Sequence, residues 1–196
     1  MSTQRPRDRY ETKEQATAYT SPWSVRARLG MLLFRIVWLL VCRPLPKQLK
    51  GWRIFILRCF GAKISGRPFI SPSCVIKIPW LLELEDHACL GPNSEVYNLG
   101  PVILRARSTV SQGAYLCGGT HDFSVRALPL ITAPIEIKED AFLGAKAFLM
   151  PGVVVGKGAL VGAAAVVHKD VAPWSIVAGN PAQVVGTRAF EGRDSA

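Results

Sequence analysis

An aliphatic residue recurs at every sixth position through residues 137–172: Ile137, Leu143, Leu149, Val155, Val161 and Val167. Four places after each of these stands a small or β-branched residue, namely Ala141, Ala147, Val153, Ala159, Ala165 and Val171. An amphipathic helix needs a period near 3.6 residues and a half-buried strand needs a period of 2, so neither explains the pattern. A period of six predicts a parallel β-helix, whose short strands are joined by turns at a fixed interval.

Three hexads make one coil of 18 residues in this interpretation, and each hexad forms one wall of a triangular prism. The aliphatic residue points inward and stacks on its equivalent in the next coil. The residue four places later lies near a corner, where space is limited, and is therefore small. Glycines at 144, 156 and 162 suit tight bends at which a Cβ would be costly. Stacked coils pair their backbone groups with the coils above and below, so each depends on its neighbours.

The same pattern occurs earlier in the chain with a longer repeat. The expected inward residues are Ile64, Ile70 and Ile76, then Leu84, Leu90 and Val96, then Leu104, Val110 and Leu116. These coils have 20 residues each, so we expect a two-residue bulge at one corner. The pattern stops after residue 117 and resumes at Ile137, which predicts a long loop over 118–134. Loops of this length in a compact domain are usually functional or disordered.

The fold class is therefore an all-β solenoid of about five coils over residues 61–178, with residues 179–196 as a tail that leaves the prism and lies along its side. Pro173 and Trp174 are expected to break the period. Residues 1–22 are polar and expected to be loosely ordered. Residues 23–60 are predicted to form two basic amphipathic helices, 23–42 and 47–60. The second helix covers the open first coil, which would otherwise be an exposed sheet edge.

The apolar part of the first helix, residues 29–42, leaves two interpretations open. Fourteen residues, interrupted by Arg35, are too few for the roughly 20 that span a bilayer, so a transmembrane helix is the least favoured. The helix either packs on the prism or a partner subunit, or lies in the membrane interface. Trp38 and the flanking arginines support the interfacial alternative.

The net charge of +10 belongs to the N-terminal part of the chain. Residues 1–67 hold 14 Lys or Arg against 3 Asp or Glu, whereas residues 68–196 hold 10 against 11. An anionic lipid surface is a more natural partner for this segment than nucleic acid, since no stacking platform or nucleic-acid motif accompanies the charge.

Five cysteines, an odd number without any CxxC pair, indicate free thiols in a reducing compartment. The first apolar run begins near residue 29 and no cleavage site follows it, so no signal peptide is expected. We therefore expect a cytoplasmic protein, at the inner face of the membrane if the first helix is interfacial.

Several stretches carry a resemblance to a known family: FGAKI (60–64), YNLGPV (97–102), SQGAYLCGGTHDF (111–123), LITAPI (130–135) and VAGNPAQVV (177–185). With the hexads, they resemble the hexapeptide-repeat acyltransferases, in particular the colanic acid biosynthesis group of polysaccharide O-acetyltransferases. The resemblance implies a left-handed parallel β-helix, acetyl-CoA as the donor substrate, and a sugar hydroxyl of a polysaccharide precursor, free or lipid-linked, as the acceptor. It also implies a homotrimer whose active site lies between subunits.

His121 is the candidate general base. A neutral imidazole is the usual group for removing a hydroxyl proton near pH 7, and the matching histidine of the resembling family has this role. One ring nitrogen should take the proton, and the other should be held by a carbonyl or carboxylate that fixes the tautomer. Asp122 is not the expected partner, because neighbouring side chains of an extended chain point apart.

The remaining site residues also follow from the resemblance. Asn98 matches an asparagine near the acceptor or the oxyanion, although a turn asparagine that satisfies its own backbone is the alternative. Backbone groups of Ala145 and Ala163 match contacts to the pantetheine arm of CoA. Lys169 and Arg188 match basic residues that approach the nucleotide phosphates, where charge-assisted hydrogen bonds are strong.

Three alternatives to direct transfer by His121 are a covalent acyl-enzyme, a metal-dependent enzyme and a non-catalytic scaffold. Cys117, four residues before His121, could form an acyl-enzyme, but it takes a wall position in the register. A metal-dependent enzyme of the carbonic anhydrase type would need three converging histidines, and His87, His121 and His168 are 34 and 47 residues apart. No metal is therefore expected. A non-catalytic scaffold that keeps the solenoid is the third alternative.

Overall fold

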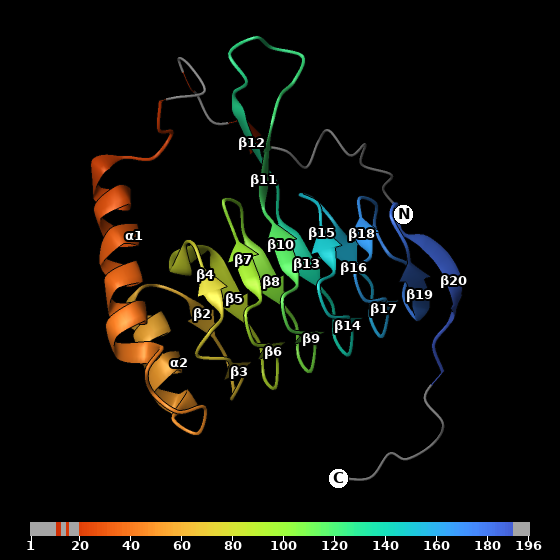
Figure 1. Cartoon of the computed structure of the whole chain (residues 1–196), viewed down its shortest axis with the longest axis horizontal. Helices are drawn as coiled ribbons and strands as arrows, with labels where there is room; N and C mark the ends of the chain where they lie inside the picture. The colour runs from red at the N-terminus through yellow and green to blue at the C-terminus, as the bar shows by residue number, and fades with distance from the viewer. Residues whose placement is uncertain (1–10, 13–14, 16–19, 190–196) are drawn as a thin grey trace.

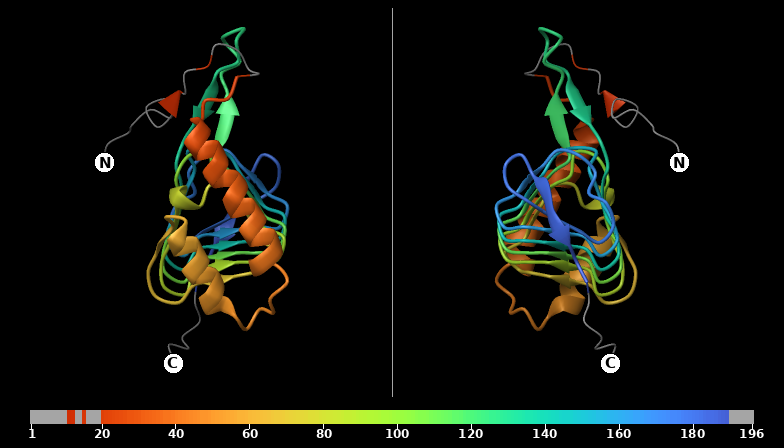
Figure 2. Two further views of the ribbon diagram at one scale, coloured as in Figure 1. Left: turned by 90° about the vertical axis from the view of Figure 1, so that its left-hand side faces the viewer. Right: turned by 90° about the vertical axis from the view of Figure 1, so that its right-hand side faces the viewer.

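The computed structural model describes residues 11–12, 15 and 20–189. It is a parallel β-helix of five complete coils and a partial sixth, with two helices at its N-terminal end and a hairpin projecting from its side (Figure 1). The predicted solenoid of about five coils is thus confirmed. Viewed along its axis, the prism is triangular (Figure 2).

The prism has three walls. Wall 1 contains β2 (Lys63–Ile64), β5 (Leu82–Leu84), β8 (Val102–Leu104), β13 (Ile135–Ile137) and β16 (Val154–Val155). Wall 2 contains β3 (Phe69–Ile70), β6 (Cys89–Leu90), β9 (Thr109–Val110), β14 (Phe142–Leu143), β17 (Leu160–Val161), β19 (Ser175–Ala178) and β20 (Gln183–Thr187). Wall 3 contains β4 (Val75–Ile76), β7 (Glu95–Tyr97), β10 (Tyr115–Cys117), β15 (Phe148–Leu149) and β18 (Val166–Val167). Corner A joins wall 1 to wall 2, corner B joins wall 2 to wall 3, and corner C joins wall 3 to wall 1 of the next coil.

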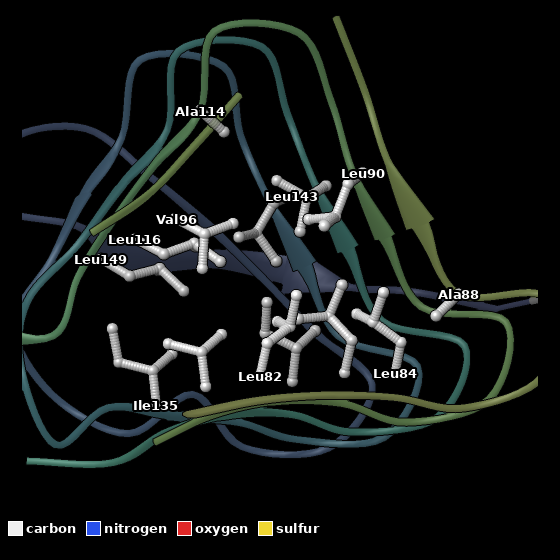
Figure 3. Packing of buried hydrophobic residues seen from close by; sticks show 14 of the residues in the cluster. Leu82, Leu84, Ala88, Leu90, Val96, Ala114, Leu116, Ile135, Leu143 and Leu149 are labelled. Carbon is white, nitrogen blue, oxygen red and sulfur yellow. The ribbon is translucent and has the colours of Figure 1, made fainter. Parts of the chain in front are cut away.

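The strand register matches both predicted repeats. Leu84 pairs with Ile64 and Leu104, at the 20-residue spacing. Leu149 pairs with Val167, at the 18-residue spacing. The aliphatic side chains of successive coils stack inside the prism, where those of the central coils are fully buried (Figure 3). Burying each such side chain contributes about 1.5–3 kcal/mol.

The solenoid continues past the expected break at Pro173. Trp174 takes a left-handed φ of 63°, as do His87 (56°), Arg107 (57°) and Asp140 (59°) at the same corner A of earlier coils. After it, β19 pairs in parallel with β17, and β20 pairs antiparallel with β19. The expected tail is therefore wrong in part: residues 183–187 extend wall 2 instead of lying along the side of the prism.

Two helices cover the N-terminal end (Figure 2). Helix α1 (Val25–Val37) begins after Ser24, whose hydroxyl accepts from the Ala27 N–H, and continues as a π-helical segment over Trp38–Cys42. Helix α2 (Lys50–Cys59) contacts β2 and β3 of the first coil. A short 3₁₀ helix, Pro79–Leu81, forms corner C of the first coil. Within the described part of the chain, no helix is both long and apolar enough to cross a bilayer.

The buried Arg53 of α2 forms hydrogen bonds to the preceding linker and to the first coil. Its guanidinium donates to the carbonyl oxygens of Ile70 (3.0 Å), Lys47 (2.8 Å) and Pro46 (3.2 Å). Burial lowers the pKa of this guanidinium. The cation thus satisfies several carbonyl groups at once, which compensates for its removal from water.

The segment 118–134 is a β-hairpin, not an irregular loop. Strands β11 (Gly119–His121) and β12 (Leu130–Thr132) pair antiparallel and stand out from corner C (Figure 1). A third strand, β1 (Glu11–Thr12), adds to β12, and the Gln15 side chain accepts from the Leu130 N–H at 2.7 Å. Part of the segment expected to be loosely ordered is therefore structured. Residues 1–10, 13–14, 16–19 and 190–196 lie outside the described residues.

Candidate active site

His121 ends β11, and its ring is held by the backbone across the hairpin. The Nδ1 atom lies 2.6 Å from the carbonyl oxygen of Leu128. A carbonyl oxygen can only accept, so Nδ1 carries a hydrogen, and in the neutral imidazole Nε2 then keeps its lone pair. This is the tautomer that a general base requires, and a carbonyl is one of the two partners that the sequence predicted.

Local hydrogen bonds at the hairpin tip present this carbonyl to the ring. Leu128 has a left-handed φ of 48°, and its N–H donates to the Val125 carbonyl at 2.9 Å. The Asp122 N–H donates to the Pro129 carbonyl at 3.0 Å. The Asp122 carboxylate accepts from the Ser124 N–H and hydroxyl, at 2.9 and 2.6 Å. The Asp122 carboxylate therefore stabilises the turn. The ring of His121 is held by the Leu128 carbonyl instead, in agreement with the expectation that Asp122 is not its partner.

The base of the hairpin is packed closely against corner C of the preceding coil. A Cβ on Gly119 would lie 3.0 Å from the Leu99 Cδ1, and one on Gly118 would lie 2.9 Å from the Tyr97 carbonyl oxygen. Leu130, which pairs with His121, is buried in a small apolar cluster with Leu99. Glycine at both positions thus allows the hairpin to leave the wall in close contact with it.

The side chain of Asn98 is hydrogen-bonded to the backbone of the preceding coil. Its side chain is fully buried, its Oδ1 accepts from the Ile78 N–H at 2.9 Å, and its Nδ2 donates to the Ile78 carbonyl at 2.6 Å. Both backbone groups belong to the two-residue bulge at corner C of the previous coil. The amide thus satisfies backbone groups of the preceding coil, whereas the alternative prediction was a turn asparagine that satisfies its own backbone; the role at the oxyanion stays a prediction.

Ala145 and Ala163, the predicted contacts to the pantetheine arm, lie at the same corner of the prism. They occupy corner B of consecutive coils, and the Ala164 N–H donates to the Ala145 carbonyl at 2.8 Å. A Cβ on Gly144 would lie 2.6 Å from the Ala163 nitrogen, so only glycine permits this stacking. The result is a corner surface of small residues, with Ala163 exposed. The exposed Lys146 lies at the same corner, and sequence reasoning missed it; its outward position in the hexad was the available signal.

Lys169 and Arg188 do not join this surface. Lys169 is exposed after β18, at corner C, which is also the corner that carries the His121 hairpin two coils earlier. Arg188 lies at corner A, where its Nη1 donates to the carbonyl oxygens of Asp140 (2.9 Å) and Gly158 (3.2 Å). Different corners of one chain therefore hold these two residues, and their approach to the nucleotide phosphates in a site between subunits stays a prediction.

The other titratable candidates are placed away from a shared centre. The Cys117 Sγ donates to the Gly119 carbonyl at 3.1 Å, and burial raises the pKa of its thiol, which disfavours the thiolate needed for an acyl-enzyme. All five cysteines are free. The His87 Nδ1 lies 2.8 Å from Asp86 at corner A, and His168 is exposed at corner C. Among the described residues, no three His, Cys, Asp or Glu side chains gather as metal ligands.

An aromatic ladder on the outer face of wall 3 was not foreseen. The Tyr97 and Tyr115 rings stack with centroids 6.0 Å apart, and those of Tyr115 and Phe148 with centroids 5.1 Å apart. The Lys77 ammonium lies 5.9 Å from the Tyr97 centroid. Burial and the nearby Glu95 raise the pKa of Tyr115 to about 12, so it is a neutral phenol. The sequence could have indicated this ladder, because each aromatic residue stands next to an inward aliphatic residue and must therefore point outward.

Comparison with known proteins agrees with this architecture. The family described as the hexapeptide repeat of succinyl-transferase matches residues 134–169. The chain is also 41% identical over 143 residues to WcaF of Escherichia coli (strain K12), which is named as a colanic acid biosynthesis acetyltransferase. That match covers 73% of this chain and 79% of WcaF. The chain therefore belongs to the hexapeptide-repeat acyltransferases, and within them to the family of WcaF.

Solved structures of low sequence identity share the fold. The hexapeptide-repeat acetyltransferase VCA0836 of Vibrio cholerae, in its complex with acetyl coenzyme A, has a TM-score of 0.75 at 18% identity; the match covers 88% of this chain and 94% of that one. A maltose O-acetyltransferase of Clostridium difficile 630 has a TM-score of 0.72 at 15% identity, covering 85% of this chain and 90% of that one.

Proposed function

We propose that the protein transfers an acetyl group from acetyl-CoA to a sugar hydroxyl of a polysaccharide precursor, with His121 as the general base. The observation that carries this proposal is the hydrogen bond between the His121 Nδ1 and the Leu128 carbonyl, because it leaves Nε2 free to accept a proton. The family supplies the acyltransferase class. A sugar hydroxyl as the acceptor is supported by the name of WcaF, which refers to a polysaccharide, and by the shared fold of the maltose O-acetyltransferase.

The reaction is a direct displacement. His121 Nε2 takes the proton of the acceptor hydroxyl as its oxygen attacks the thioester carbonyl carbon. The tetrahedral intermediate collapses with cleavage of the carbon–sulfur bond, and the proton passes from the imidazolium to the departing CoA thiolate. The raised pKa of Cys117 argues against a covalent acyl-enzyme on the way. Asn98 acts as a positioning residue, since its amide fixes the corner against which the hairpin packs.

The active site is proposed to form between subunits of a homotrimer. In one chain His121 stands at corner C, whereas the small-residue surface of Ala145 and Ala163 lies at corner B, along a different edge of the prism. A neighbouring subunit that packs its corner B against the hairpin would bring the two together, as closed cyclic symmetry allows. Lys169 lies on the same edge as His121, and Lys146 on that of the alanines, so both cations are suitably placed for the phosphates of CoA.

The outer face of α1 is proposed to lie on the cytoplasmic surface of a membrane. The side chains of Leu29, Leu33 and Ile36, and of Leu40 in the π-helical segment that continues the helix, are exposed and apolar. The helix and the segment after it are rich in arginine and lysine, which are complementary to anionic lipids. An enzyme attached in this way would stay where a membrane-bound precursor is assembled.

The test is turnover of acetyl-CoA with a panel of oligosaccharide acceptors by the wild type and by His121→Ala. We expect the variant to lower kcat by about a hundredfold or more, as for loss of a general base, while the Kd for acetyl-CoA stays unchanged. Unchanged kcat in the variant would overturn the assignment of His121. Failure of the wild-type protein to consume thioester with any acceptor would favour the non-catalytic scaffold instead.

A further inference from the structure

A groove of about 620 Å³ runs between α1 and the first two strands of wall 3. Its size falls in the range of sites that hold a molecule of moderate size. Trp23 and Leu99 line one end and Arg43 the other, so the groove follows the length of the helix. His121 does not line it, and the function proposed above leaves this space unused.

The lining of the groove is largely apolar and aromatic. Trp38 and Tyr97 contribute their rings, and a hydrogen bond from the Trp38 Nε1 to the Cys74 carbonyl, 2.9 Å long, fixes the indole. Leu32 and Leu39 line the groove and are also exposed. The groove is thus continuous with the apolar outer face of α1, and a hydrocarbon chain could pass from one to the other along these leucine side chains.

Cations follow the same groove. Arg28, Arg35 and Arg43 line it from the helix side, and Lys77 lines it from the strand side, against Glu95 as the single carboxylate of the lining. Arg28 and Arg35 are seven residues apart, which places them about 10 Å apart along the helix axis. Within the described residues, no carboxylate pairs with any of the three guanidinium groups. Their charges are therefore available to an anionic ligand.

One end of the groove reaches the base of the catalytic hairpin. Leu99 and Trp23 line the groove and also belong to the apolar cluster around Leu130. Leu130 pairs with His121 across the hairpin. In Figure 1 the N-terminal end of α1 lies at the level where the hairpin leaves the prism. A ligand that fills the groove would therefore have one end close to the proposed base.

We propose that this groove binds the phosphorylated lipid that carries the acceptor sugar. The apolar chain lies between α1 and wall 3, and the arginines bind the phosphate, with Arg28 nearest the hairpin. The inference rests on the proposed function for the nature of the acceptor. A soluble acidic glycan would use the cations but would leave the aromatic and aliphatic lining without a partner, so the amphiphile is favoured.

Dodecyl phosphate is the probe, titrated into the full-length protein by calorimetry below its micellar concentration. Because charge-assisted bonds to phosphate add to the apolar contacts, we expect it to bind about tenfold or more tightly than dodecyl maltoside or inorganic phosphate. Equal affinity for dodecyl maltoside would overturn the phosphate assignment. Equal affinity for inorganic phosphate would overturn the assignment of the lipid chain.

Matched variants locate the binding. Arg28→Gln combined with Arg35→Gln should weaken dodecyl phosphate binding by about tenfold or more, since both cations line the groove. Arg26→Gln combined with Lys47→Gln removes the same charge from exposed residues outside the groove and should change it less than about twofold. Val75→Trp, which places an indole in the groove, should also abolish binding, whereas Val25→Trp should not. Unaffected binding in both groove variants would overturn the proposal.

The His121→Ala variant separates this inference from the proposed function. It should bind dodecyl phosphate with wild-type affinity, because His121 lies outside the groove. If dodecyl phosphate binds as expected but no acceptor is acetylated, the proposed function fails and the binding site stands. If acceptors are acetylated but dodecyl phosphate does not bind, the groove inference alone is overturned.

Discussion

The Nδ1 of His121 lies 2.6 Å from the carbonyl oxygen of Leu128, in the turn of a hairpin that projects from the prism. The pairing joins a side chain to a backbone group seven residues later in the chain, so it exists only because the hairpin folds back. It fixes the protonated nitrogen of the ring and leaves the other free.

Leu128→Pro should disturb this partnership without unfolding the protein. Proline cannot adopt the φ of 48° found at Leu128 and lacks the N–H that donates to the Val125 carbonyl, so the 128 carbonyl should move away from the ring. We expect kcat to fall about tenfold or more, because the base loses its fixed tautomer. Steady-state kinetics and the thermal midpoint of unfolding are the measurements.

Leu128→Gly is the control for that variant. Glycine adopts positive φ freely and keeps both backbone groups, so kcat should remain near the wild-type value. Equal losses in the proline and glycine variants would mean that the leucine side chain, and not its carbonyl, matters.

Asn98→Ala tests whether this residue is a positioning residue or a catalytic one. The substitution leaves the Ile78 N–H buried without its partner, whereas the Ile78 carbonyl still accepts from the Leu81 N–H at 3.1 Å. Urea denaturation should therefore show a free energy of unfolding lower by about 1–3 kcal/mol, the cost of one unsatisfied buried donor. A collapse of kcat with unchanged stability would instead restore the predicted role at the oxyanion.

Mixed oligomers test whether the active site is shared between subunits. His121→Ala and Ala163→Asp should each be inactive alone, since one lacks the base and the other places a carboxylate at corner B. After dissociation and reassociation of an equal mixture, about one interface in four should combine the two intact halves and recover activity. His121→Ala mixed with His121→Gln should recover none. Absence of recovery in the first mixture would place the whole site within one chain.

Asp140→Asn should remove a pH-dependent contribution to stability. The Arg107 guanidinium, bonded to both carboxylate oxygens at 2.6 and 2.9 Å, lowers the pKa of Asp140 in the folded state. The ion pair therefore stabilises the fold above the unfolded pKa, and this contribution disappears as the pH falls through the lower folded pKa. Because Arg107 is 59% exposed, we expect only about 0.5–1 kcal/mol at pH 7.

Denaturation of wild type and Asp140→Asn between pH 7 and pH 3 measures this contribution. Asparagine tolerates the positive φ at position 140, so the comparison isolates the charge. The Arg107→Gln variant should show the same loss, and the double variant should add little to it. A difference between wild type and variant that grows as the pH falls would contradict the assignment.

The outer face of α1 is tested by vesicle flotation. Leu33→Gln combined with Leu40→Gln, at side chains 56% and 72% exposed, should weaken binding to vesicles containing anionic lipid by about tenfold. Val184→Gln combined with Val185→Gln is the matched control, because those residues are 69% and 63% exposed on β20, at the opposite end of the prism (Figure 1). Unchanged flotation would overturn the membrane assignment. A change of oligomeric state in the α1 variant would identify the face as a subunit contact.

The unforeseen part of the site lies where the repeat is interrupted. Residues 118–134 carry no sixfold pattern, so their strand pairing and the addition of β1 could not be predicted from periodicity. Asn98 stands in the corner bulge, and its partner Ile78 is 20 residues away, in the preceding coil. The groove lies between α1 and the first two strands of wall 3. The helical pattern predicts the one and the hexad pattern predicts the other, but neither predicts the space between them.

The sequence by itself determined the solenoid, its coil lengths and its inward residues. Each coil pairs only with adjacent coils, so a local period of six is sufficient to specify the stack and its core. The sequence also indicated His121, because a histidine stood in the interruption of the pattern. Only the tertiary structure decided which carbonyl holds its ring, which corner carries each predicted CoA contact, and how far α1 stands from wall 3. Those relationships join segments that no repeat connects, and packing of unlike side chains sets them.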